Sequence, residues 1–140
     1  MIFSPALLIP WITACVRTGF PSPAADYHEE RIDLNKELIT HPLATFIVDS
    51  EGDSMIDAFI PPRARLVIDK ALTAKNGDLV LAILNGEFTV KYLKKNDFKC
   101  WLIPANKKYP DIEIKDGMDF QVWGVVTRII IDPKDTRCML

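Results

Sequence analysis

The sequence is poor in several residue types that common catalytic and structural sites require. Its 140 residues include only two histidines, three cysteines and six glycines, and the formal net charge is −2. The cysteines Cys15, Cys100 and Cys138 are odd in number and form no Cys-x-x-Cys pair. We therefore expect no structural zinc or other metal, no cofactor, and a reducing cytoplasmic compartment.

The small net charge also argues against direct contact with nucleic acid. A phosphate-binding surface normally shows an excess of basic residues. The short basic pairs Lys94-Lys95 and Lys107-Lys108 are interpreted as solvated turns. We expect no direct sequence-specific DNA binding.

No apolar run in the sequence is long enough to cross a bilayer. The run from Ala6 to Val16 is interrupted by Pro10, and no Lys or Arg precedes it, so it lacks the charged start of a signal peptide. We expect no membrane anchor, and we interpret this run as an apolar arm that docks on its own protein or on a partner.

The remaining pattern predicts three parts: an arm over residues 1–40, a strand-rich domain over residues 41–131 and a polar tail over residues 132–140. Prolines and the lack of periodicity favour extended chain in the arm, followed by a short helix over Leu34–Ile39 that Asp33 caps. Asn85-Gly86 is a strong signal for a β-hairpin. Strands are predicted over residues 44–48, 65–69, 79–84, 88–93, 101–103, 112–114 and 120–131, which makes the fold mainly β.

Gly52-Asp53-Ser54-Met55 is the stretch with the clearest chemical potential. Gly52 and Asp53 favour a tight turn that presents the Ser54 hydroxyl, and residues 55–57 offer the first turn of a short helix. A serine hydroxyl needs a neighbouring base to become a nucleophile. Lys91 is the candidate base, because it interrupts an otherwise apolar strand, and a lysine covered by apolar neighbours has a lowered pKa.

Each of these residues also has a simpler interpretation. Ser54 could complete a turn without reacting, and Lys91 could lie on the solvent-facing side of a half-buried hairpin strand. Strand alternation puts Lys91 on one face with Glu87, Thr89 and Leu93. That face must be partly covered if Lys91 is a base.

Three motifs, in their order along the chain and at their spacing, resemble those of UmuD, the self-cleaving mutagenesis subunit related to the LexA repressor. They are the Ser54 stretch, Lys91 within Gly86-Glu87-Phe88-Thr89-Val90-Lys91 at 37 positions after Ser54, and the upstream run from Gly19 to Tyr27. The similarity extends from about Phe20 to Ile131. It implies a LexA/UmuD-like peptidase domain of short, twisted strands and hairpins preceded by a mobile N-terminal arm.

The resemblance also implies an activity. Members of this group are serine endopeptidases with a Ser/Lys dyad, here Ser54 and Lys91, that cut their own chain. The cut bond would be Thr18-Gly19, directly before the Gly-Phe-Pro-Ser-Pro run. Relatives usually carry Cys or Ala where this chain has the β-branched Thr18. The backbone N–H groups of Asp53 and Ser54 are our candidates for the oxyanion hole.

The partners implied by the resemblance belong to the SOS response to DNA damage. UmuD-like proteins form homodimers, cut themselves when a RecA filament on single-stranded DNA promotes it, and then join a UmuC-like Y-family polymerase in translesion synthesis.

Two further classes of function are open at this stage. One is an accessory module that regulates a polymerase or repressor on the same scaffold without cutting. The other is a LexA-like repressor, which we disfavour because about 40 residues before the strands are too few for a DNA-binding domain and linker. A signal-peptidase-like enzyme uses a similar dyad but would need a membrane anchor.

Overall fold

The structure is a computed structural model that describes residues 6–12, 19 and 29–135. The chain divides into two compact units, Met1–Thr40 and His41–Leu140.

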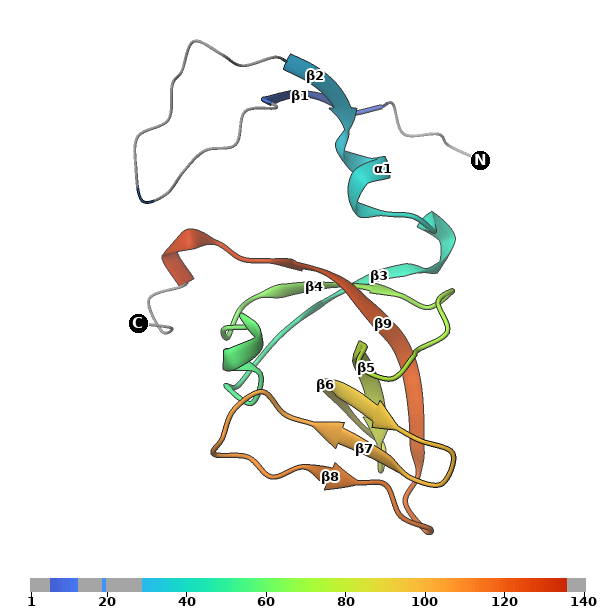
Figure 1. Ribbon diagram of the computed structural model, residues 1–140. Coiled ribbons are helices and arrows are strands. Elements are labelled where there is room, and N and C mark those ends of the chain that lie inside the picture. The colour runs from blue at the N-terminus through green and yellow to red at the C-terminus, as the bar shows by residue number, and fades with distance from the viewer. Residues whose placement is uncertain (1–5, 13–18, 20–28, 136–140) are drawn as a thin grey trace. The chain divides into compact units, whose positions relative to one another are not determined.

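The first unit contains a two-stranded antiparallel sheet followed by a short helix (Figure 1). β1 (Leu8–Ile12) pairs with β2 (Glu29–Asp33), and α1 (Leu34–Leu38) follows directly. The Asp33 side chain accepts a hydrogen bond from the Asn35 backbone N–H at 3.0 Å, so the predicted cap is confirmed. The strand pair is not predicted from the sequence, because all five residues of β1 are exposed and no buried face imposes a period of two.

The second unit is a seven-stranded antiparallel sheet in the order β3-β4-β9-β5-β6-β7-β8. Because β9 lies between β4 and β5, the last strand joins the two halves of the sheet (Figure 1). The mainly β fold class is confirmed. The strands are β3 (Thr45–Asp49), β4 (Arg65–Asp69), β5 (Leu79–Leu84), β6 (Glu87–Lys95), β7 (Cys100–Ile103), β8 (Ile112–Glu113) and β9 (Phe120–Ile130), with 3-10 helices η1 (Pro42–Ala44) and η2 (Ile56–Ala58).

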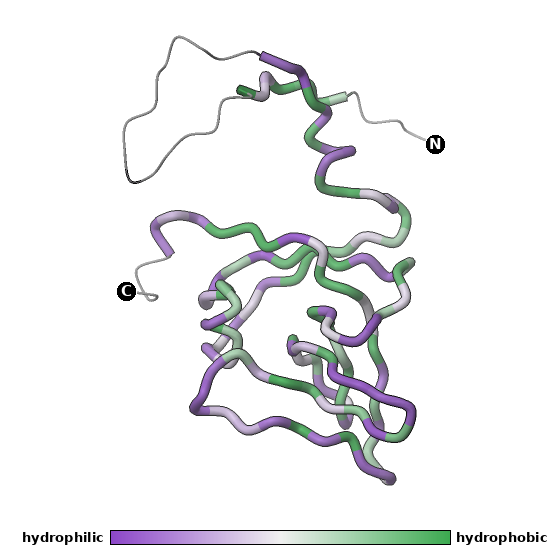
Figure 2. Tube along the Cα trace, viewed as in Figure 1, coloured by the Kyte–Doolittle hydropathy of each residue, from purple (hydrophilic) through white to green (hydrophobic). Residues whose placement is uncertain are grey.

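The hairpin of β5 and β6 sets the position of Lys91. Asn85 and Gly86 have φ angles of 50° and 83°, as the predicted type I′ turn requires. The resulting register pairs Lys91 with Val80, which is fully buried. Hydrophilic residues gather at the β6–β7 and β8–β9 turns, whereas β9 is largely apolar (Figure 2).

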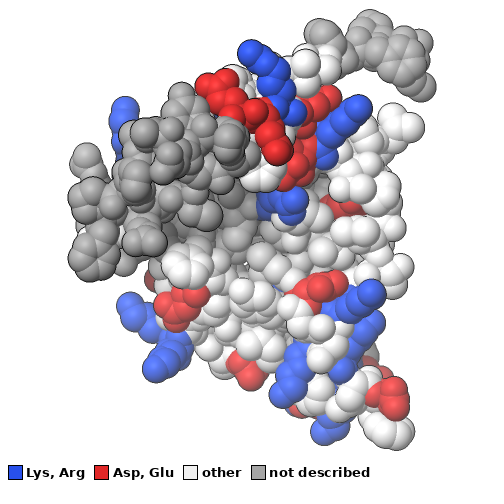
Figure 3. Space-filling model, turned by 45° about the horizontal axis from the view of Figure 1, so that its top comes forward, with Lys and Arg blue, Asp and Glu red and all other residues white. Residues whose placement is uncertain are grey.

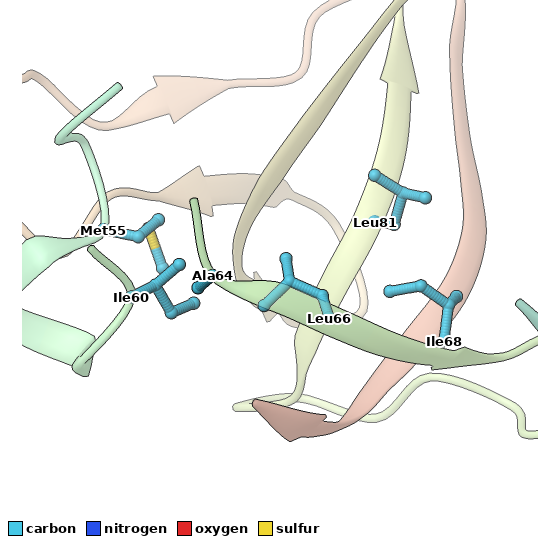
Figure 4. Packing of buried hydrophobic residues seen from close by; sticks show 6 residues of the cluster. All are labelled: Met55, Ile60, Ala64, Leu66, Ile68 and Leu81. Atoms are coloured by element: carbon cyan, nitrogen blue, oxygen red, sulfur yellow. The ribbon is translucent and has the colours of Figure 1, made fainter. Parts of the chain in front are cut away.

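Two groups of buried residues form the core of the second unit. One contains Val80, Ala82, Leu93 and Leu102. The other connects the segment after Ser54 to strands β4 and β5, so the turn that carries Ser54 is tied to the sheet (Figure 4). Its members are Met55, Ile60, Ala64, Leu66, Ile68 and Leu81. Among the residues that the structure describes, no helix is long and apolar enough to cross a membrane.

Candidate active site

Ser54 lies on the turn between β3 and η2. Gly52 has a φ of 77°, a left-handed conformation that glycine adopts without strain, and it reverses the chain before Ser54. Met55 is only 4% exposed and packs in the core, so it anchors the turn from the other side. The Ala58 N–H donates to the Met55 carbonyl at 3.0 Å at the start of η2. The predicted turn followed by a short helix is confirmed.

The Lys91 side chain is buried and reaches Ser54. Lys91 is 8% exposed, which contradicts its interpretation as a solvent-facing lysine. Nζ lies 3.1 Å from Ser54 Oγ, 2.7 Å from Thr89 Oγ1 and 3.1 Å from the Val90 carbonyl oxygen. Thr89 lies on the same face of β6 as Lys91, as alternation predicts.

These three neighbours fit a neutral amine. Burial lowers the pKa of Lys91 below its usual value of 10.5. A neutral amine has two N–H bonds and one lone pair. If the two N–H groups donate to Thr89 Oγ1 and the Val90 carbonyl, the lone pair is left to accept the Ser54 hydroxyl proton.

The Ser54 and Lys91 side chains line one cleft of about 360 Å³. Its lining combines polar residues, such as Asp49 and Ser50, with apolar residues, such as Leu81 and Phe88. Phe88 is 62% exposed and extends the apolar lining into solvent. A concave site that combines apolar lining with a few polar groups is typical of ligand-binding clefts.

The backbone N–H groups of Asp53 and Ser54 are the candidate oxyanion donors. Within the described part of the chain, neither group donates to an acceptor of the protein. Donors that are fixed and unused beside a nucleophile are what an oxyanion hole needs.

The two residues of the predicted cut differ in what the structure describes. Thr18 lies outside the described residues. Gly19 is exposed, and a Cβ built on it would meet no atom within 4 Å.

Asp69 and Cys100 lie outside the lining of the Ser54 cleft and have shifted pKa values. His41 Nδ1 lies 2.6 Å from Asp69 Oδ2, and this hydrogen bond holds the pKa of the buried Asp69 carboxyl below its usual value. Burial raises the pKa of the Cys100 thiol, which makes it less reactive. Over residues 6–12, 19 and 29–135, no cluster of His, Cys, Asp and Glu could hold a metal ion.

Charge on the surface is mixed in sign. On the face shown in Figure 3, Lys and Arg side chains gather near the lower edge with Asp and Glu side chains beside them. Opposite charges also pair, since Lys99 Nζ lies 3.7 Å from Glu113 Oε1. The mixture of signs agrees with the low net charge of the sequence.

Sequence reasoning missed two residues at the Ser54 turn. Asn106 and Tyr109, in the segment between β7 and β8, both donate hydrogen bonds to Asp53. They lie more than 50 positions from Ser54, and nothing in the local sequence pattern connects them to it. Strand alternation puts Thr89 on the same face of β6 as Lys91, but alternation does not predict the hydrogen bond between the two side chains.

Comparison with known proteins supports the family resemblance independently of the geometry of the site. A model of the family described as Peptidase S24-like matches residues 10–127. The chain is 42% identical over 127 residues to protein SamA of Salmonella typhimurium, covering 91% of this chain and 88% of that protein. It is 38% identical over 125 residues to protein MucA of Escherichia coli, covering 89% and 85%. The LexA repressor of a Nocardioides species is 33% identical over 115 residues, covering 82% of this chain and 45% of the repressor.

Proposed function

The chain belongs to the Peptidase S24-like family, in its UmuD-like group, and we propose that it is a serine endopeptidase that cuts its own Thr18-Gly19 bond. The observation that carries this proposal is the 3.1 Å separation between the buried Lys91 amine and the Ser54 hydroxyl. In the proposal, residues 1–40 are the arm with the cleavage site, residues 41–131 are the peptidase domain and residues 132–140 are a polar tail.

The reaction begins with proton transfer inside the pair. Neutral Lys91 takes the Ser54 hydroxyl proton as Oγ forms a bond to the Thr18 carbonyl carbon. The N–H groups of Asp53 and Ser54 donate to the negative oxygen that results. Protonated Lys91 then gives its proton to the Gly19 nitrogen as the peptide bond breaks.

The second half of the reaction releases the serine. Water attacks the ester between Ser54 and Thr18, and Lys91 accepts a proton from that water. Ser54 recovers its proton from Lys91, and the products are residues 1–18 and 19–140. A bond on the same chain or on a partner chain has a high effective concentration, which compensates for a slow catalytic pair.

The biological setting proposed here is the SOS response. Membership of the UmuD-like group supports a role in SOS mutagenesis, with cutting promoted by a RecA filament on single-stranded DNA. The chain would act in the cytoplasm as a homodimer and join a UmuC-like Y-family polymerase in translesion synthesis.

Cutting of purified full-length protein tests the proposal. Wild type, Ser54→Ala and Lys91→Ala are incubated with RecA filaments and at alkaline pH, and intact masses are recorded over time. We expect wild type to yield residues 19–140 and Lys91→Ala to lose cutting by about 10²–10⁴-fold, the usual contribution of a general base. Ser54→Ala should lose at least as much, because it removes the nucleophile.

Lys94→Ala, an exposed lysine on the same strand, is the matched control and should cut like wild type. Lys91→Met keeps the unbranched side chain and guards against misfolding of Lys91→Ala. Unchanged cutting in Ser54→Ala or in both Lys91 variants would exclude the pair. An intact wild-type mass under both conditions would instead favour an accessory module that regulates a polymerase or repressor without cutting.

A further inference from the structure

The segment between β7 and β8 forms hydrogen bonds with the turn that carries Ser54. Asn106 Nδ2 donates to the Asp53 carbonyl oxygen at 2.8 Å, and the Ala105 N–H donates to the Ser54 carbonyl oxygen at 2.9 Å. The Ala105 carbonyl in turn accepts from the Asp57 N–H at 2.8 Å. These bonds link the segment to both sides of Ser54.

Tyr109 adds a bond to a side chain of the same turn. Its hydroxyl donates to Asp53 Oδ1 at 2.5 Å. Asp53 is therefore held at two points, by Asn106 through its carbonyl and by Tyr109 through its carboxylate. The Asp53 carbonyl also accepts from the Ile56 N–H at 3.2 Å, so both of its acceptor positions are occupied.

The peptide bond connects these contacts to the reaction. The Asp53 carbonyl and the Ser54 N–H belong to one planar trans peptide unit, in which they point in opposite directions. Fixing the carbonyl on one side therefore fixes the direction of the N–H on the other. We propose that Asn106 and Tyr109 are positioning residues that hold this peptide plane so that the Ser54 N–H faces the oxyanion.

This inference rests on the proposed function, because it assigns a purpose to the Ser54 N–H in that reaction. A hydrogen bond to the carbonyl also polarises the peptide unit and strengthens its N–H as a donor. The hydrogen bond with Asp53 raises the pKa of Tyr109 above its usual value of 10.0, which favours the protonated hydroxyl that donates to Asp53.

Two substitutions separate positioning from support of the loop. Asn106 Oδ1 accepts from the Lys108 N–H at 3.0 Å and shapes the loop itself. Asn106→Asp keeps this acceptor, replaces the Nδ2 donor by an oxygen and adds a negative charge. Tyr109→Phe adds no charge and removes only the hydroxyl. Lys107→Gln changes an exposed neighbour in the same loop and serves as the control.

The rate of self-cutting is measured across pH for full-length wild type and these variants, together with unfolding temperatures. We expect Asn106→Asp to slow cutting about 10- to 100-fold, somewhat less than loss of a direct oxyanion donor, and Tyr109→Phe about 3- to 10-fold. The pH midpoint should not move for Tyr109→Phe, because this change adds no charge and Lys91 Nζ forms its hydrogen bonds with Ser54, Thr89 and Val90. Lys107→Gln should behave like wild type.

A second measurement does not depend on the arm. Labelling of Ser54 by a fluorophosphonate, read as a mass increase, also develops negative charge on oxygen and should slow by similar factors. The inference is overturned if both variants cut and label at the wild-type rate while Ser54→Ala is inactive, or if losses follow only a fall in unfolding temperature. Equal cutting by Ser54→Ala and wild type would instead overturn the proposed function itself.

Discussion

At the scale of single residues, the proposed reaction depends on the surroundings of one amine. Lys91 is 8% exposed, and its nitrogen is surrounded by the hydroxyls of Ser54 and Thr89 and by the Val90 carbonyl. None of these neighbours carries a charge that would stabilise an ammonium ion. Burial therefore lowers the pKa of Lys91 and makes the neutral form available as a base.

The same burial makes stability depend on pH. Because the pKa of Lys91 is lower in the folded chain than the ordinary 10.5, the unfolded chain binds more protons between these two values. The contribution of Lys91 to stability therefore rises with pH through that window. Replacing Lys91 by Met removes the titration, so the advantage of Lys91→Met over the parent should be largest below the lowered pKa and shrink toward pH 10.5.

Urea unfolding at a series of pH values measures this difference, with Ser54→Ala in both proteins to prevent cutting. Inside the window the difference should change by about 1.4 kcal/mol for each pH unit. A difference that stays constant from neutral pH to pH 10.5 would show that Lys91 titrates normally.

The sequence indicates part of the site at this scale. Gly52 and Asp53 mark the turn, and the apolar neighbours of Lys91 suggest partial burial. The proximity of Ser54 to Lys91 is expected only from the family resemblance, because no local pattern relates positions 37 apart. Asn106 and Tyr109 could not be found, because their hydrogen bonds to Asp53 form only after the strands have assembled.

At the scale of elements, β4 and β9 approach each other closely at Gly124. A Cβ built on Gly124 would lie 2.5 Å from Ile68 Cγ2 and 3.3 Å from the Asp69 carbonyl oxygen. Ile68 is fully buried in the core that also holds Met55, so it has little freedom to move aside. The absence of a side chain at Gly124 is what allows this packing.

Gly124→Ala should therefore destabilise the second unit. We expect a loss of about 1–3 kcal/mol in the free energy of unfolding, the usual cost of inserting a methyl group into a packed core. Urea unfolding measures the loss, and Gln121→Ala, an exposed position on the same strand, is the control. If the urea midpoint of Gly124→Ala is no lower than that of Gln121→Ala, the two strands accommodate the added methyl group with little loss of stability.

Elements were predictable where the local pattern was strong. The strands over Arg65–Asp69 and Leu79–Leu84 have the bounds that were predicted, because each contains an uninterrupted apolar run with a polar residue on both sides. The pairing of β1 with β2 was not predictable, because strands with mostly exposed side chains need no alternation of apolar and polar residues. The strand order was also beyond prediction, since it depends on contacts between β9 and strands far earlier in the chain.

At the scale of the whole molecule, the proposed reaction needs the arm as well as the domain. The described residues supply the cleft, the amine and the hydroxyl, while Thr18 lies outside them. The partition of the chain into arm, domain and tail therefore remains a proposal, as does the identity of the cut bond. Only a reaction that starts from the full-length chain brings these parts together.

The pH dependence of self-cutting by the full-length protein tests the central claim most directly. The rate of appearance of residues 19–140 is measured by mass spectrometry from neutral pH to about pH 11. The account predicts a rate that rises about tenfold per pH unit and levels off at a midpoint below 10.5, where Lys91 has lost its proton. A rate that does not vary with pH, or a midpoint at the ordinary lysine value, would contradict it.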